Sequence, residues 1–165
     1  MSKTEDNLKE AFAGESQANR KYLAFAKHAD KEGYPQAAKL FRAAAEAETV
    51  HAHAHLRALK GINSTAENLK EAIEGEIHEF KEMYPQMIEN AQAGGNKVAE
   101  RSFRFANEVE EIHAGLYQEA LDSLDNPGDI ECYYVCQVCG YTVADSAPDA
   151  CPVCGAKPNA FSGID

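Results

Sequence analysis

Glutamate and histidine recur in a repeated pattern along the first part of the chain. Glu15 precedes the motif Glu48-x-x-His51, and Glu76 precedes the motif Glu110-x-x-His113 at nearly the same distance. Because residues three apart share a helix face, each Glu-x-x-His would point both side chains the same way. Hard carboxylate oxygens can bridge two ions, and neutral imidazole can complete the coordination of each. The repeat therefore predicts a site for two iron or manganese ions between helices.

Other polar residues lie beside this set. Glu79 follows Glu76 by three residues, on the same helix face, and would be a fifth carboxylate. Tyr22 and Tyr84 are expected to be core residues, but a buried phenol needs a partner, so either could hydrogen-bond to a ligand. The sequence assigns no metal role to the remaining histidines: His28, His53, His55 and His78.

Solvated helix faces are the alternative explanation for glutamates in a chain of this kind. In the helix that carries the second motif, however, the acid and the histidine fall on a stripe that normally holds apolar residues. That stripe comprises Phe103, Ala106, Glu110, His113 and Tyr117. The pattern therefore favours an inward-facing metal site.

Cysteines indicate a second site near the end of the chain. Cys136-x-x-Cys139 and Cys151-x-x-Cys154 are each followed directly by glycine, which permits the tight turn that aims backbone amides at sulfur. Paired C-x-x-C motifs predict a tetrahedral four-sulfur metal site. Zinc there would be structural and iron would carry one electron, and the spacing leaves both open. Disulfides are disfavoured because no secretion signal is visible, and Cys132 is expected to be a free thiol without an assigned role.

Four helices are predicted before the cysteines, at about residues 4–30, 35–60, 65–92 and 97–124. Gly33 and Gly61 are expected at the ends of the first two helices, and Ser64-x-x-Glu67 fits a capping box that opens the third. Pro85 should kink the third helix or break its last turns. Asn126-Pro127-Gly128 is expected to end the fourth helix.

The predicted helices and the cysteines define two parts. Four long helices with short connections predict an up-down-up-down bundle, residues 1–126, in which the four metal-binding segments meet at one level. Residues 130–165 are too few to fold on an apolar core alone, so a bound metal is expected to hold them together. The predicted fold class is mainly α: a four-helix bundle with a small C-terminal metal module of four cysteines.

The overall charge excludes some partners. The chain has 16 Lys and Arg against 27 Asp and Glu, and a formal net charge of −11. An acidic surface repels nucleic acid and anionic membranes, so neither is an expected partner. No apolar run has the roughly 20 residues needed to cross a bilayer. The polar N-terminus shows no signal peptide, and the cytoplasm is the expected compartment.

With these motifs in place, the chain resembles the rubrerythrin family over essentially its whole length. The resemblance is most specific at residues 15–20, at Glu48–His51, at Glu76–Glu79 with Met83-Tyr84-Pro85, and at Glu110–His113. The cysteine module resembles the rubredoxin-like domain of that family. The additional carboxylate, Glu79, distinguishes this pattern from that of plain ferritin-like bundles.

The resemblance implies a ferritin-like bundle with a non-haem di-iron site. Glu48 and Glu110 would bridge the irons, and the terminal ligands would be Glu15, Glu76, Glu79, His51 and His113. On reduction, Glu79 would leave and His51 would bind, while Tyr22 and Tyr84 would hydrogen-bond to ligands. Glu79, His51, Tyr22 and Tyr84 are therefore the expected catalytic residues.

The implied activity is the reduction of hydrogen peroxide to water, in protection against oxidative stress. Electrons would come from an external rubredoxin or an NAD(P)H-dependent reductase and pass through a rubredoxin-like Fe(Cys)4 centre. The resemblance further implies an antiparallel homodimer, with the cysteine module of one chain serving the di-iron site of the other. The interval between the cysteine pairs is shorter than in free-standing rubredoxins, so zinc stays an alternative metal in the four-cysteine site.

Two other functions fit the same residues. A ferroxidase would prefer dioxygen and would release ferric iron. A metal-stabilised binding or storage protein with a zinc staple would be colourless and redox-silent.

Overall fold

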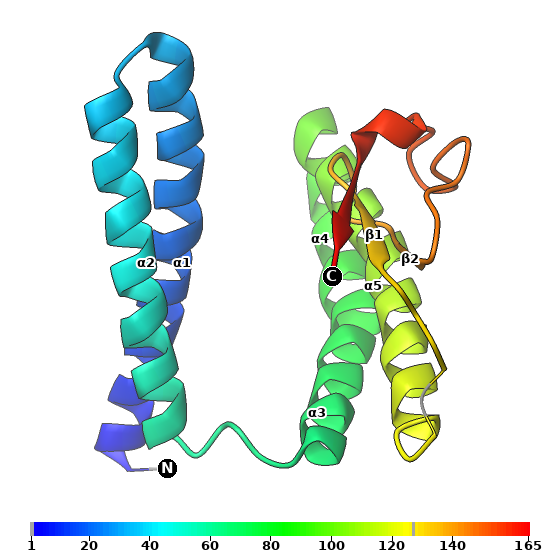
Figure 1. The fold of residues 1–165 in the computed structure, drawn as a ribbon, viewed down its shortest axis with the longest axis horizontal. Helices are drawn as coiled ribbons and strands as arrows, with labels where there is room; N and C mark the ends of the chain where they lie inside the picture. The colour runs from blue at the N-terminus through cyan, green and yellow to red at the C-terminus, as the bar shows by residue number, and fades with distance from the viewer. Residues whose placement is uncertain (1, 127) are drawn as a thin grey trace. The chain divides into compact units, whose positions relative to one another are not determined.

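The computed structural model describes residues 2–126 and 128–165, so Pro127 of the expected helix-ending tripeptide lies outside the described residues. The chain divides into two compact units, one up to Asn63 and one from Ser64 onward. Figure 1 draws the helices and strands of both units.

The first unit is an antiparallel helical hairpin of α1 (Lys3–Glu32) and α2 (Pro35–Ala58). Ser2 and Glu5 form a capping box at the start of α1, and Gly33 ends the helix with a left-handed φ of 82°. Alanines fill the buried seam of the hairpin: Ala26, Ala29, Ala38, Ala45 and Ala52. The three on α2 are spaced seven apart and form one stripe, and their small side chains allow close packing of the two helices.

The end of α2 differs in detail from the prediction. The residue in the left-handed conformation is Lys60, with φ 57°, and not Gly61. The amide of Lys60 donates to Arg57 O and the amide of Gly61 donates to Leu56 O, both at 3.0 Å, which is a Schellman ending. A Cβ on Gly61 would lie 2.6 Å from Leu56 Cδ1, so a larger residue there would require the end of the Leu56 side chain to move.

The second unit begins with a long helical segment in three parts. These are α3 (Thr65–His78), the π-helical turn η1 (Glu79–Met83) and α4 (Tyr84–Ala93). Ser64 and Glu67 form the predicted capping box. All three parts pack against α5 (Lys97–Asp122). The predicted break near Pro85 is present, and it takes the form of a π turn immediately before the first turn of α4.

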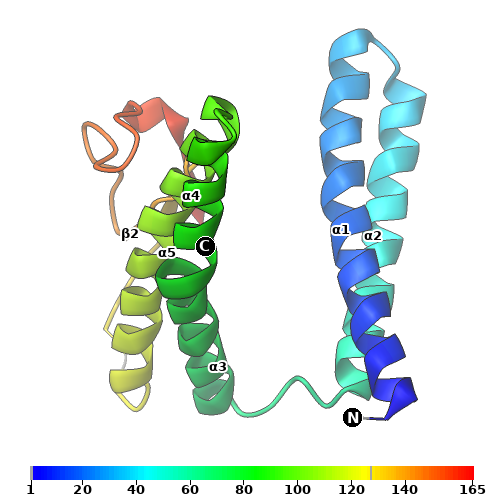
Figure 2. The ribbon, with the colours of Figure 1, turned by 180° about the vertical axis from the view of Figure 1, so that it is seen from behind.

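The C-terminal module belongs to the second unit and contains three short strands: β1 (Tyr133–Cys136), β2 (Thr142–Ala144) and β3 (Phe161–Ile164). They form an antiparallel sheet in the order β2-β1-β3, with the short 3-10 helix η2 (Pro158–Ala160) before β3. The module lies beside α5 in both views (Figure 2). The predicted fold class, mainly helical with a small Cys-rich module, is confirmed. Among the described residues, no helix is long and apolar enough to cross a membrane.

Candidate metal centres

The first cluster of ligand atoms lies in the α1–α2 hairpin. Glu15 comes from α1, and Glu48 and His51 come from α2. His51 Nδ1 lies 2.9 Å from Glu48 Oε2 and 3.9 Å from Glu15 Oε1. One ligand atom from each residue lies within 4.8 Å of the others, so the three could hold one ion. The hydrogen bond with His51 holds the pKa of Glu48 below its usual value.

The second cluster has the same design in the second unit. Glu76 comes from α3, and Glu110 and His113 come from α5. His113 Nδ1 lies 2.8 Å from Glu110 Oε2 and 3.8 Å from Glu76 Oε1, and all three offer ligand atoms within 4.8 Å. The sequence repeat is thus a structural repeat: each half presents one glutamate, one Glu-x-x-His and the Nδ1 atom of its histidine.

The carboxylates of the second cluster repel one another. Burial, followed by the charge of Glu110, raises the pKa of Glu76 to about 7. The same two causes raise the pKa of Glu79, and the hydrogen bond to Glu110 raises the pKa of His113. Without a cation, this group therefore keeps protons that free carboxyl groups would lose, which is the behaviour expected of a cation site.

Glu79 and Tyr84 are positioned by the π turn. Glu79 is the first residue of η1, and the amide of Tyr84 donates to its carbonyl oxygen five residues earlier. This wide turn brings Tyr84 toward the face that carries Glu79. Burial and the charges of Glu79, Glu110 and Glu76 raise the pKa of the Tyr84 phenol, so it stays protonated. Glu79 itself lies outside the Glu76–Glu110–His113 cluster.

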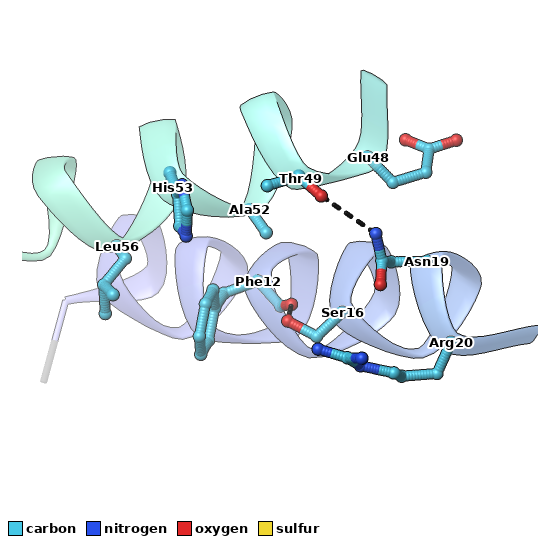
Figure 3. Close-up of a pocket in the computed structure, with 9 residues that line it drawn as sticks. All are labelled: Phe12, Ser16, Asn19, Arg20, Glu48, Thr49, Ala52, His53 and Leu56. Carbon is cyan, nitrogen blue, oxygen red and sulfur yellow. Dashed lines mark hydrogen bonds between the residues drawn. The ribbon is translucent and has the colours of Figure 1, made fainter. Parts of the chain in front are cut away.

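A small groove of about 210 Å³ lies between α1 and α2 beside Glu48 (Figure 3). In it, the Asn19 amide donates to Ala45 O at 2.7 Å and to Thr49 Oγ1 at 2.9 Å. Asn19 lies one turn after Glu15, and Thr49 follows Glu48 directly. This crosslink fixes the register of the two helices at the height of the first cluster.

The four cysteines meet as the sequence predicts. Cys136 Sγ lies 3.7 Å from Cys154 Sγ, and Cys139 Sγ lies 3.5 Å from Cys151 Sγ. These separations are too long for disulfides. Four thiolates at about 2.3 Å from a tetrahedral ion are separated by about 3.8 Å. The sulfur atoms therefore stand at the distances that a metal requires, and the disulfide alternative is wrong.

The two cysteine turns are built alike. Gly140 and Gly155 have left-handed φ values of 90° and 74°, and their amides donate to Cys136 O and Cys151 O at 2.8 Å. Burial alone would raise the pKa of Cys136, but the amides of Val138 and Cys139 point at its sulfur and leave that pKa lowered. Such amides stabilise thiolate, the form that binds metal.

The module touches the second cluster directly. The Thr142 hydroxyl, on β2, lies 3.0 Å from His113 Nε2. Close by, a Cβ on Gly140 would lie 3.6 Å from Val109 Cγ1 of α5. No motif pointed to Thr142, because its partner is 29 residues away and the contact is made only in the folded chain. Tyr117 was likewise assigned no role, yet burial, with the charges of Glu76 and Glu110, raises its pKa.

The remaining candidates lie elsewhere. Tyr22 packs against Phe25 and Phe41, with ring centroids 6.4 and 6.3 Å away, and its hydrogen bond to a ligand stays a prediction. His53 is exposed and lines the groove beside Glu48. The Cys132 thiol faces the backbone oxygen of Tyr133 at 3.4 Å and is not part of the four-cysteine group.

Two carboxylate–imidazole clusters on paired helices and an attached four-cysteine module define a helical metalloprotein of the carboxylate type. Family models agree with this class. The rubrerythrin model matches residues 6–121, and the model for the rubredoxin-like domain of rubrerythrin matches residues 134–162. The chain belongs to the rubrerythrin family, and the resemblance stated from the sequence is confirmed.

Individual relatives match along nearly the whole chain. Rubrerythrin-2 of Clostridium acetobutylicum is 40% identical, over 98% of this chain and 96% of its own length. Nigerythrin of Nitratidesulfovibrio vulgaris is 35% identical, over 96% of this chain and 85% of its own. Among solved structures, nigerythrin in a mixed-valence state matches with a TM-score of 0.60 and 35% identity, over 99% of this chain and 88% of that chain. Another structure of nigerythrin is described as fully reduced and all ferrous.

Proposed function

We propose that this protein is a non-haem di-iron peroxidase that reduces hydrogen peroxide to water, with electrons relayed through its four-cysteine module. Its family generally comprises oxidoreductases, which supports a redox activity. The observation that carries the proposal is the hydrogen bond between Thr142 and His113. It places a module whose four cysteine sulfur atoms stand at metal-binding distances in contact with an imidazole of a carboxylate–histidine cluster, so an electron carrier would adjoin a redox site.

The proposed ligand set for two irons is the one expected from the sequence: Glu15, Glu48, His51, Glu76, Glu79, Glu110 and His113. Its donor chemistry fits, because carboxylates and imidazoles suit iron, and each cluster offers ligand atoms within 4.8 Å of one another. Iron, when bound, would supply the two electrons that convert one peroxide into two waters. Iron is likewise proposed for the four-cysteine site, where zinc would also fit.

The same reaction consumes two protons, and this chain has groups that can hold them. Tyr84 keeps its phenol proton, because burial and the nearby carboxylate charges raise its pKa. Glu79 has a raised pKa and lies outside the cluster of Glu76, Glu110 and His113. We propose that Glu79 is the ligand that exchanges with His51, and that Tyr84 donates hydrogen bonds to the ligands, with Tyr22 in the matching role in the first unit.

The decisive test compares oxidants. Anaerobically reduced, iron-loaded protein is mixed with stoichiometric peroxide or with air-saturated buffer, and both iron chromophores are followed by stopped-flow absorbance. Faster oxidation by peroxide, followed by oxidation of the iron–sulfur centre in the module, is the expected result. Faster oxidation by dioxygen with release of ferric iron would support the ferroxidase alternative, and a colourless, redox-silent protein would support the binding alternative.

A homodimer is proposed as well, with the module of one chain near the partner's iron site. The contact of the module with His113 of its own chain is compatible with this arrangement if one site contains clusters from both chains. Light scattering would measure the mass of the dimer. Its composition can be tested with His51→Gln and His113→Gln chains. If one site takes its two clusters from two chains, mixing these inactive variants restores peroxide reduction. If both clusters come from one chain, the mixture stays inactive.

The proposed electron donor is a rubredoxin or an NAD(P)H-dependent reductase. Each is tested by adding it to the oxidised protein and measuring reduction of the iron.

A further inference from the structure

Thr142 makes two hydrogen bonds whose directions are linked. Its Oγ1 atom lies 3.0 Å from Gly140 O and 3.0 Å from His113 Nε2. A carbonyl oxygen can only accept, so the hydroxyl proton points to Gly140. The lone pair of Oγ1 then faces His113, and the Nε2 atom must carry a proton to complete the second bond.

The other ring nitrogen of His113 faces the carboxylates. Its Nδ1 atom lies 2.8 Å from Glu110 Oε2 and 3.8 Å from Glu76 Oε1. A neutral imidazole has one protonated nitrogen and one nitrogen with a free lone pair, and only the latter can bind a metal. With the proton held on Nε2, the lone pair lies on Nδ1, toward the acidic cluster.

The carbonyl that accepts the Thr142 hydroxyl proton belongs to a cysteine turn. Gly140 follows Cys139 directly, has a left-handed φ of 90°, and donates its amide to Cys136 O at 2.8 Å. The carbonyl that orients Thr142 is therefore fixed by the same turn that presents two of the four sulfur atoms. Occupation of the four-cysteine site would hold this turn in place.

We propose that Thr142 is a positioning residue for the bundle metal site, which fixes the ring orientation and the Nδ1 lone pair of His113 from within the four-cysteine module. The inference rests on the proposed function in that His113 is taken as a metal ligand. It goes beyond that function because a residue of the module would then set the orientation and the protonated nitrogen of a metal ligand in the bundle. Outer partners of metal-bound histidines typically change metal affinity about 10- to 100-fold when removed.

The test uses full-length, iron-loaded, reduced protein with three variants. Thr142→Val keeps the shape and removes the hydroxyl, Thr142→Ser restores a hydroxyl, and Ser162→Ala removes an exposed hydroxyl from the same sheet as a matched control. The first readout is the rate at which a ferrous chelator removes bundle iron. The second readout is the rate at which the hyperfine-shifted N–H protons of the two bound histidines exchange in D2O. The signal that disappears in a His51→Gln chain is assigned to His51, and the other to His113.

We expect Thr142→Val to lose iron about 10- to 100-fold faster from one bundle position. Its His113 N–H should exchange several-fold faster, while the His51 N–H stays at the wild-type rate. Thr142→Ser should return both values toward wild type, and Ser162→Ala should change neither. Wild-type behaviour of Thr142→Val, or equal defects in the Val and Ser variants, would overturn the inference. Neither readout uses peroxide, so a protein that binds iron but fails to reduce peroxide would overturn the proposed function alone.

Discussion

Glu76 shows how the acidic cluster lowers the stability of the folded protein when no cation is present. Burial and the charge of Glu110 raise its pKa to about 7 in the folded chain, against an ordinary value of 4.5. The unfolded chain therefore loses this proton first as the pH rises. We expect the stability of metal-free protein to fall between about pH 4.5 and 7 and to level off above that.

This prediction is checked by urea unfolding of metal-free protein across that pH range. Glu76→Gln should flatten the dependence, because the substituted side chain cannot ionise. Bound divalent metal should reverse the trend, since metal binding competes with protons for the same carboxylates. A stability that rises with pH in metal-free wild-type protein, or an unchanged pH dependence in Glu76→Gln, would contradict the assignment.

The Tyr84 phenol carries a second prediction at the same scale. Its raised pKa keeps it a donor at neutral pH, next to the charges of Glu79, Glu110 and Glu76. Tyr84→Phe should leave iron content unchanged and lower the rate of the proposed peroxide reduction, by about 10²-fold if the phenol acts in proton transfer. Stopped-flow oxidation measures this rate. Tyr34→Phe is the control, because Tyr34 is exposed, and an equal loss in both variants would rule out a specific role.

Local spacing explains why so much of the site could be predicted. Each Glu-x-x-His pair shares a helix face by geometry alone, and the structure brings six of the seven expected ligand residues into two clusters. Glu79 lies outside both clusters and is the first residue of the π turn, which the spacing of the glutamates alone does not predict. Thr142 could not be found from sequence, because its bond to His113 joins a strand to a distant helix.

The helix ends also differ in whether neighbouring residues or more distant contacts determine them. The Ser64–Glu67 capping box and the effect of Pro85 arise within a few residues, and the structure has both near their predicted positions. The left-handed residue after α2 is Lys60, and Gly61 is the next residue, packed close to the Leu56 side chain. This packing joins the turn to the helix, and the residue types alone suggested the reverse assignment, with Gly61 left-handed.

Glu100 is the polar link between α4 and α5. This buried carboxylate accepts from Gln92 Nε2 and Lys97 Nζ at 2.9 Å and from Arg104 at 3.2 Å. The hydrogen bonds from Lys97 and Gln92 hold the pKa of Glu100 at about 2, below its usual value of 4.5. Its contribution is thus complete above about pH 4.5 and is lost as the pH falls toward 2.

Glu100→Gln should therefore lower the melting temperature at pH 7 and reduce the loss of stability on acidification. Thermal unfolding at pH 7 and at pH 3 measures both effects. Glu108→Gln, an exposed position on α5, is the matched control and should change neither value. Equal melting temperatures for wild type and Glu100→Gln at pH 7 would show that the network does not stabilise the helix pair.

On the scale of the molecule, the helices and the four-cysteine module depend on metal in different ways. Each helical pair buries its own seam and has its own caps. The described part of the module has short strands, a short 3-10 helix and two buried cysteines, Cys136 and Cys151. A segment of this size rarely folds without a disulfide or a bound metal. Cys154→Ser should therefore weaken metal binding by the four cysteines and unfold residues 130–165, while the helices persist.

Limited proteolysis and far-ultraviolet circular dichroism separate these outcomes. We expect fast cleavage within the module, retained helical signal, and loss of any visible absorption from iron bound to sulfur. Cys132→Ser is the matched control, because Cys132 is not part of the four-cysteine group, and it should resist cleavage like wild type. Since Thr142 lies in the module, Cys154→Ser should also speed iron release from the bundle, as we expect for Thr142→Val. If the module unfolds and the bundle still releases iron at the wild-type rate, the bundle site orients His113 without help from Thr142.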